Sequence, residues 1–194
     1  MKIVIDKNKV LSTRMKHILP RVNSTYHARM RRITGEHYRF LTYMSWQFTN
    51  ASFLDLGSRG GMSAICLADN PSNKITSVDI TDEFRKQYPS NFSSYSNINF
   101  IIERAQDYQS SFYDNFDLIL LDIDHSGHSE KKILDKINQS KFSGILIMDD
   151  INYNKFKELK VVWSKIERPK RILEYAHHSG TGIISYGMEI EYID

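Results

Sequence analysis

The chain has 194 residues, of which 41% are hydrophobic and 25% charged, which is typical of a globular domain with room for a real core. Its formal net charge of +3 excludes a protein that is strongly basic throughout, and no apolar run is long enough to cross a membrane. The N-terminus lacks the apolar core and cleavage site of a secretory signal, and the one cysteine, Cys66, cannot form an internal disulfide. We therefore expect a soluble, cytoplasmic protein without a membrane partner.

Residues 1–50 are predicted to form a helical cap, with helices near 24–33 and 36–48, over a core domain of residues 51–194. Basic side chains gather in this segment, and two histidines lie among them: Arg14, Lys16, His17, Arg21, His27, Arg29, Arg31 and Arg32. A solvated helix face is the favoured interpretation, and a contact surface for an anionic substrate or a nucleic acid is the alternative. Glu36 and His37, near the start of the second helix, could line a pocket beneath the cap.

The segment 53–64 predicts a strand, a glycine-rich turn and a helix, which is the place where open α/β sheets bind nucleotides. Glycines leave the backbone of the turn open to a ligand, and free N–H groups at the start of the helix favour an anionic group. A dinucleotide fingerprint would need glycine at the third and sixth positions counted from Gly57, where this chain has Arg59 and Met62. The turn therefore disfavours a nicotinamide-dependent oxidoreductase.

Strands and helices alternate along the rest of the chain. The predicted strands cover 53–56, 74–79, 99–102, 116–122, 144–148, 172–175 and 181–186, and the predicted helices cover 61–69, 81–88, 129–137 and 155–166. This alternation predicts an α/β fold with a doubly wound, mostly parallel sheet. The last two strands should pair antiparallel, because no helix separates them.

Polar and acidic residues stand at the carboxyl ends of five of these strands, where such sheets bind ligands. They fall within 55–63, 104–107, 122–128 and 149–152, together with Asp79. A carboxylate at the position of Asp79 can accept hydrogen bonds from two ribose hydroxyls. Asp79 could instead cap the helix that follows, although Thr81 and Asp82 are also suited to that role.

The turn reads Asp-x-Gly-x-x-Gly-Gly-x-Ser and resembles the first motif of class I S-adenosylmethionine-dependent methyltransferases, and the likeness extends over residues 35–187. The resemblance implies a seven-stranded sheet with a C-terminal antiparallel strand, and S-adenosylmethionine as the cofactor. It also implies that Asp79 binds the ribose, while Ala105 and Gln106 lie near the adenine. The cofactor-binding residues that it implies are Asp55, Gly57, Ser58, Gly61, Ser63, Asp79, Ala105, Gln106 and Asp122.

The segments LLDIDHSGH and IMDDIN resemble the metal-dependent catechol-type O-methyltransferases and related small methyltransferases. The resemblance implies Mg²⁺ or Mn²⁺ on Asp122, Asp149 and Asp150, although Asp150 stands where the family has asparagine. Three adjacent carboxylates would also repel one another strongly without a cation. The alternative is that these aspartates cap helices or bind the amino group of the cofactor.

His125 falls where the catechol-type family has its catalytic lysine, so we expect His125, together with Asp122, to carry the chemistry. A histidine side chain can take the proton of a substrate hydroxyl near neutral pH. Hydrogen bonding within its own loop is the alternative role. His128, His177 and His178 are weaker candidates, and the last two are expected to be exposed in the final hairpin.

The expected function is transfer of a methyl group from S-adenosylmethionine to an oxygen of a small molecule or sugar, with or without a divalent metal. One alternative is a metal-independent methyltransferase that acts on nitrogen or on nucleic acid, although the chain lacks the Asn-Pro-Pro-Tyr and cysteine-nucleophile motifs of base methylation. Another is a non-catalytic module that keeps the pocket and binds a partner through its basic segment. The acceptor is expected beneath residues 1–50 and near 88–98, 124–128 and 177–180, and the sequence does not indicate an oligomeric state.

Overall fold

The computed structural model describes residues 2–15, 36–82 and 94–194. The predicted helix at 24–33, nearly all of the one at 81–88, and the basic side chains from Lys16 to Arg32 lie outside the described residues. The second helix of the predicted cap is present as α3 (Glu36–Ser45). Among the helices that the structure describes, none is both long enough and apolar enough to cross a membrane.

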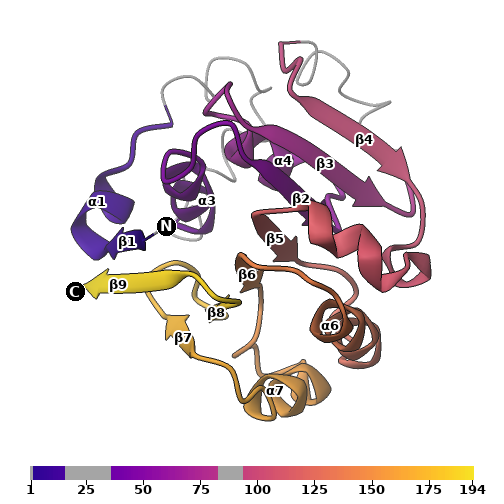
Figure 1. The fold of residues 1–194 in the computed structure, drawn as a ribbon. Coiled ribbons are helices and arrows are strands. Elements are labelled where there is room, and N and C mark those ends of the chain that lie inside the picture. Colours follow the sequence, from indigo (N-terminus) through magenta and orange to yellow (C-terminus); the bar gives the residue numbers. More distant parts are fainter. Residues whose placement is uncertain (1, 16–35, 83–93) are drawn as a thin grey trace.

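Seven strands form one sheet, in the order β4-β3-β2-β5-β6-β8-β7. Their bounds are β2 (Ser52–Leu56), β3 (Lys74–Asp79), β4 (Ile98–Ile102), β5 (Leu118–Leu121), β6 (Ile145–Met148), β7 (Lys170–Leu173) and β8 (Thr181–Ser185). Neighbouring strands are parallel except for β8, which runs antiparallel to both β6 and β7. This arrangement confirms the predicted α/β fold with a mostly parallel sheet and one late antiparallel strand (Figure 1).

Helices cover both faces of the sheet (Figure 1). One face packs against α3 and α4 (Met62–Leu67), and the other packs against α6 (His128–Gln139) and α7 (Lys157–Ser164). In the central strand β5, Leu118 and Leu120 belong to the first core, whereas Ile119 and Leu121 belong to the second. Successive side chains of a strand point to opposite faces, so a continuous apolar run suits a strand that is covered on both sides.

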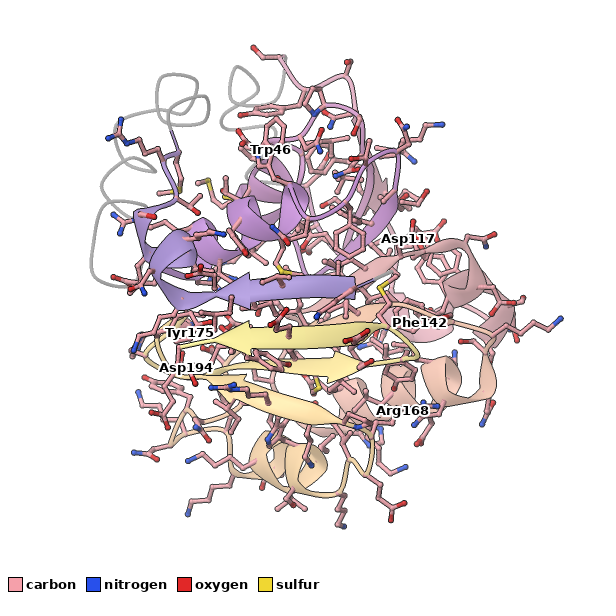
Figure 2. The ribbon with its side chains drawn as sticks, turned by 60° about the vertical axis from the view of Figure 1, so that its left-hand side comes forward. Trp46, Asp117, Phe142, Arg168, Tyr175 and Asp194 are labelled. Carbon is pink, nitrogen blue, oxygen red and sulfur yellow. The ribbon has the colours of Figure 1, made fainter. Side chains whose placement is uncertain are left out.

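The described part of the N-terminal segment contains a strand and a short helix that the sequence does not predict. β1 (Lys2–Asp6) pairs in parallel with β9 (Glu189–Ile193), and α1 (Lys7–Ser12) follows β1 directly. Asp6 caps α1, because its Oδ1 accepts hydrogen bonds from the backbone N–H groups of Asn8 and Lys9 at 2.9 and 3.1 Å. Figure 2 shows β1 and β9 as neighbouring arrows, so distant parts of the chain meet in one small sheet.

Two short helices between β4 and β5, η3 (Ala105–Asp107) and η4 (Ser110–Asn115), are also absent from the sequence prediction. They are 3-10 helices of three and six residues, too short to produce a helical pattern of apolar residues. η3 is held to α6 by Lys136, whose Nζ donates hydrogen bonds to the carbonyl oxygens of Gln106 and Tyr108 at 2.5 and 2.6 Å. These bonds fix the position of the η3 backbone, which the family resemblance predicts to lie near an adenine.

Candidate active site

A cavity of about 550 Å³ opens at the carboxyl ends of the parallel strands, where the strand order reverses between β2 and β5. It is lined by Tyr38, Gly57, Arg59, Val78, Asp79, Ile80, Thr81, Glu103, Ala105, Gln106, Asp122, Ile123, Asp124, His125, Asp149, Asp150 and His177. The structure therefore brings together most of the predicted site residues. Four predicted cofactor residues in or beside the glycine turn do not reach the lining: Asp55, Ser58, Gly61 and Ser63.

The glycine turn is tight because the protein packs against itself there. Gly57 has a φ of +93°, and a Cβ at this position would lie 1.7 Å from the carbonyl oxygen of Asp122 at the end of β5. Gly61 caps α4 in the left-handed region, with a φ of +72°. Glycine at position 57 thus allows two strand ends to meet, which is a different reason from the close approach of a ligand that the sequence suggests.

Asp55 lies behind this turn, completely buried in β2. The Ser77 hydroxyl donates a hydrogen bond of 2.8 Å to its Oδ2, while its Oδ1 has no hydrogen-bond partner. Burial raises the pKa of Asp55 to about 6, and the nearby Ser77 and Ser63 hydroxyls lower it only in part. Ser63 makes no hydrogen bond to Oδ1 in this arrangement. A buried carboxylate oxygen without a partner fits an ammonium group such as the one on the amino-acid end of S-adenosylmethionine.

Asp79 accepts hydrogen bonds from two backbone N–H groups in the loops beside it. Its Oδ2 accepts a hydrogen bond from the backbone N–H of Arg59 at 2.6 Å, and its Oδ1 accepts one from Thr81 at 3.1 Å. Asp79 therefore holds the glycine turn and the segment after β3 in place, and it also lines the cavity. A carboxylate oxygen has two lone pairs, so each oxygen can accept a further hydrogen bond from a ribose hydroxyl.

Ile80 is a site residue that the sequence analysis does not identify. This large apolar side chain follows Asp79, lines the cavity, and is 72% exposed. Ala105 and Gln106 line the same cavity. An apolar surface beside a ribose-binding carboxylate suits a flat aromatic base. The signal in the sequence is a single isoleucine directly after the acid that ends β3, outside the strand's alternation.

His125 stands between two carboxylates on the cavity wall. Its Nε2 lies 3.3 Å from Oδ1 of Asp122 and 3.6 Å from Oδ2 of Asp150, and its ring stacks on Phe156 with centroids 4.5 Å apart. His125 and Asp150 have φ values of +57° and +58°, which are uncommon for residues with side chains. Backbone strain of this kind persists only where the surroundings hold it, and it gathers at functional sites.

Glu130, which the sequence analysis also misses, holds the His125 loop. It is buried in the first turn of α6, where its two carboxylate oxygens accept hydrogen bonds from the backbone N–H groups of His125 and Gly127 at 2.7 and 2.8 Å. Burial raises the pKa of Glu130. A glycine followed by glutamate three positions later, at the start of a helix, is the sequence signal for this cap.

Asp122 is surrounded by acidic groups. Burial raises its pKa well above the usual value, and the charges of Asp149 and Asp150 raise it further. The repulsion expected among the three carboxylates is therefore present in the structure. Asp149 differs from Asp122 because its pKa is lowered rather than raised.

His37 and His177 converge on Asp149. The Nδ1 atoms of His177 and His37 lie 3.0 and 3.5 Å from Asp149 Oδ1. Burial alone would raise the pKa of Asp149, but His37 and the hydrogen bond with His177 lower it to about 2. Burial lowers the pKa of His37, whereas the carboxylates raise that of His177 in spite of its burial.

The expected exposure of His177 is wrong, while that of His178 is right. The His177 side chain is only 15% exposed, because its turn folds back onto the loop after β6. The backbone N–H groups of Ile151 and Asn152 donate hydrogen bonds to the carbonyl oxygens of Gly180 and Ser179 at 3.1 and 2.7 Å. These contacts join segments that are far apart in the sequence, so local patterns carry no sign of them.

The predicted metal ligands Asp122, Asp149 and Asp150 do not converge on one point. Asp149 faces the two histidines, and His125 separates Asp122 from Asp150. Within the described ranges, the group of possible ligand atoms that lie within 4.8 Å of one another is His37, Asp149 and His177. The trio of carboxylates does not fit a Mg²⁺ ion as arranged.

Comparison with known protein families identifies the family to which this fold belongs. A family model described as a methyltransferase domain matches residues 47–180. The chain belongs to this methyltransferase family. It is a class I S-adenosylmethionine-dependent methyltransferase, as the glycine turn and the strand-end acids predict. A search of curated proteins gives no match.

Several solved structures share the fold of this methyltransferase. A protein from Corynebacterium glutamicum has a TM-score of 0.66 and 14% identity, over 92% of this chain and 94% of its own. The methyltransferase PaMTH1 of Podospora anserina, solved with S-adenosylhomocysteine (SAH) bound, has a TM-score of 0.61 and 15% identity, over 78% of each chain. A Staphylococcus aureus protein assigned as a caffeoyl-CoA O-methyltransferase has a TM-score of 0.60 and 17% identity, over 77% of this chain and 82% of its own.

Proposed function

We propose that this methyltransferase transfers the methyl group of S-adenosylmethionine to a hydroxyl oxygen of a small molecule or sugar. The observation that carries the proposal is the position of His125 Nε2, between the carboxylates of Asp122 and Asp150 on the cavity wall. A histidine placed in this way can take a hydroxyl proton, and the two carboxylates stabilise the imidazolium that forms. The assignment of the Staphylococcus aureus relative as an O-methyltransferase agrees with oxygen as the acceptor atom.

The cofactor would bind along the glycine turn and the ends of β3 and β4. Asp79 on the cavity wall is available to its ribose hydroxyls, and the unpartnered Oδ1 of Asp55, buried behind that wall, would attract its ammonium group. Ile80 and Ala105 offer apolar surface to the adenine, with Gln106 beside them. These groups would leave the methyl-bearing end of the cofactor towards Asp122 and His125, the wall on which the acceptor must lie.

The reaction needs positioning and one proton acceptor. The bound cofactor supplies an electrophilic methyl group on a positively charged sulfur. His125 takes the proton of the acceptor hydroxyl, and the oxygen forms its bond to the methyl carbon as the carbon–sulfur bond breaks. Stacking on Phe156 and the backbone bond to Glu130 keep the imidazole in place, so most of the rate comes from orientation.

We also propose a neutral acceptor molecule and a cytoplasmic location. The cavity combines carboxylates with apolar surface, which suits a neutral polyhydroxylated or phenolic molecule better than a polyanion such as nucleic acid. Cys66 is buried and free, which is compatible with a cytoplasmic location.

Turnover of a His125→Ala variant tests the proposal. We expect kcat to fall about 10²–10⁴-fold while the Kd for SAH changes little, because the base acts on the acceptor rather than on the cofactor. The measurement uses methyl-labelled S-adenosylmethionine with a panel of phenols, catechols and sugars, followed by NMR assignment of the methylated atom. His128→Ala is the matched control, since His128 is exposed and lies outside the cavity lining. Full turnover by His125→Ala, or a methyl group found on nitrogen, would contradict the proposal.

A further inference from the structure

Three segments that are far apart in the chain place ligand-type side chains around one point. His37 comes from the first turn of α3, Asp149 from the end of β6, and His177 from the turn before β8. All three side chains are largely withdrawn from solvent, with 6%, 7% and 15% of their surfaces exposed. Possible ligand atoms on the three residues lie within 4.8 Å of one another.

The polar atoms of this cluster share their contacts, and some of these contacts are long. Asp149 Oδ1 faces His177 Nδ1 at 3.0 Å, Thr181 Oγ1 at 3.4 Å and His37 Nδ1 at 3.5 Å, and the last two distances are long for hydrogen bonds. His177 Nδ1 in turn faces Oδ1 of Asp150 at 3.3 Å and the Ser179 hydroxyl at 3.0 Å, in addition to Asp149. The hydroxyls of Ser179 and Thr181 donate to Asp150 Oδ1 and Asp149 Oδ1, so the contacts in this cluster are shared among several groups. The carboxylate and both Nδ1 atoms, when unprotonated, can also offer lone pairs to a cation.

A metal ion would use those lone pairs, and the spacing of the atoms suits one. Bonds of 2.0–2.1 Å in tetrahedral or octahedral geometry place neighbouring ligand atoms roughly 3.0–3.4 Å apart. The two Nδ1 atoms lie 3.0 and 3.5 Å from Asp149 Oδ1, close to that range. We propose that His37, Asp149 and His177 bind a divalent transition-metal ion, with Zn²⁺ as the best match. Two imidazoles and one carboxylate are typical ligands of Zn²⁺ and Fe²⁺, whereas Mg²⁺ requires oxygen ligands.

The site would leave room for an outside ligand on the cavity side. Asp149 and His177 line the cavity, and His37, which does not, closes the site from behind. Asp150 links this site to the base, because its Oδ1 lies 3.3 Å from His177 and its Oδ2 lies 3.6 Å from His125. If the proposed function holds, the ion would bind the acceptor hydroxyl and lower its pKa next to His125. This role rests on the proposed function, but the binding of the ion does not.

Metal binding can be measured without an acceptor or a cofactor. Chelator-treated protein without an affinity tag is titrated with Zn²⁺ by calorimetry, and with Co²⁺ by its visible absorption. We expect one ion per chain and a preference for Zn²⁺ over Mg²⁺. His177→Ala should weaken Zn²⁺ binding at least tenfold, and His37→Gln should do the same. His178→Ala is the matched control, because His178 adjoins His177 but is exposed and should leave the affinity within about twofold.

Two outcomes would overturn the proposal. One is the absence of stoichiometric Zn²⁺ and Co²⁺ binding by the wild-type protein. The other is binding that survives both histidine substitutions and is lost in Asp122→Asn, which would support the carboxylate trio instead. SAH binding, measured on every variant, reports whether the fold is intact. His177→Ala decides the question if the buried His37→Gln variant fails to fold. Lack of methyl transfer to oxygen, with Zn²⁺ binding retained, would contradict the proposed function and leave the metal site standing.

Discussion

Asp55 is the residue at which stability and cofactor binding oppose each other most clearly. Its carboxylate is completely buried, with one oxygen on Ser77 and the other without a partner. Burial favours the protonated form in the folded protein, whereas a bound ammonium group would favour the ionised form. The protein thus carries an unfavourable charge at neutral pH, and the cofactor would neutralise it if its ammonium group binds as proposed. Such local costs are common at functional sites.

The stability of the protein should therefore fall with rising pH because of Asp55. The pKa of Asp55 is about 6 in the folded protein and 3.8 in the unfolded chain. The stability that Asp55 contributes is therefore complete below pH 3.8 and is lost as the pH rises through 6. The loss is at most about 3 kcal/mol. An Asp55→Asn variant cannot ionise there. We expect urea unfolding to show the variant gaining stability relative to the wild type between pH 4 and pH 7.

The ligand response distinguishes this effect from a general change in the fold. SAH should raise the Tm of the wild type more at pH 7.5 than at pH 5, because the ionised Asp55 pairs with its ammonium group. Asp55→Asn should lose most of that difference. Stability curves for the wild type and the variant that run parallel across this pH range would show that Asp55 keeps an ordinary pKa.

At the scale of elements, the turn after β2 and the end of β5 form one unit. Gly57 donates its backbone N–H to the carbonyl oxygen of Val78 at 2.9 Å, and its missing side chain admits the carbonyl oxygen of Asp122. The turn therefore joins β2, β3 and β5 at the point where the cofactor would lie. Any side chain at position 57 must displace backbone atoms rather than a flexible side chain.

A Gly57→Ala substitution should destabilise the protein by about 3–5 kcal/mol and weaken SAH binding, because it adds a backbone clash to an unfavourable φ. Gly187→Ala is the matched control. Gly187 has a similar φ of +90°, but the nearest atom to its added Cβ would be the flexible Ser143 hydroxyl at 3.1 Å. It should lose only about 1–2 kcal/mol. Urea unfolding and calorimetry measure both variants, and equal losses would mean that the contact with Asp122 contributes nothing.

The elements that local patterns define could be predicted from the sequence. The bounds of β3 match the prediction at both ends, and β5 and β6 are buried apolar runs next to acids and glycine. β1 and β9 could not be predicted in this way. β9 alternates exposed glutamates with partly buried residues, and it is a strand because it pairs with β1 from the other end of the chain. Such non-local pairing leaves little local signal.

The candidate site likewise contains residues that local motifs predict and contacts that depend on distant segments. Gly57, Asp79, Asp122 and His125 follow from motifs that each lie within one segment, and all of them line the cavity. The contact of His37 and His177 with Asp149 joins three segments, and it depends on backbone bonds between loops. Sequence reasoning therefore finds the strand ends and names His37 and His177 only as weaker candidates, without predicting that they meet at Asp149.

At the scale of the whole molecule, the small β1–β9 sheet closes the chain on itself beside the larger sheet (Figure 2). Ile3 and Ile5 of β1 are almost completely buried in the core that α3 covers. The hydroxyl of Tyr43 in α3 donates a hydrogen bond of 2.7 Å to the carbonyl oxygen of Val4. The strand pair thus supports the helix that carries His37, although it lies outside the seven-stranded sheet that carries the cofactor residues.

A chain shortened to end at Gly187 should separate the support of α3 by the β1–β9 pair from cofactor binding by the seven-stranded sheet. Loss of β9 leaves β1 without its strand partner and exposes part of Ile3 and Ile5, which should cost about 2–4 kcal/mol and lower the Tm by roughly 5–15 °C. SAH binding should stay within about threefold, because β2 to β8 keep their pairing. Zn²⁺ binding should weaken more than SAH binding, because α3 loses support.

Asp194→Ala is the control for the shortened chain. It removes only the exposed ion pair with Arg171 (N···O 2.5 Å) and should change the Tm by a few degrees at most. If SAH binding were lost with β9, the small sheet would belong to the cofactor-binding core, and the separation drawn between the two sheets would be wrong.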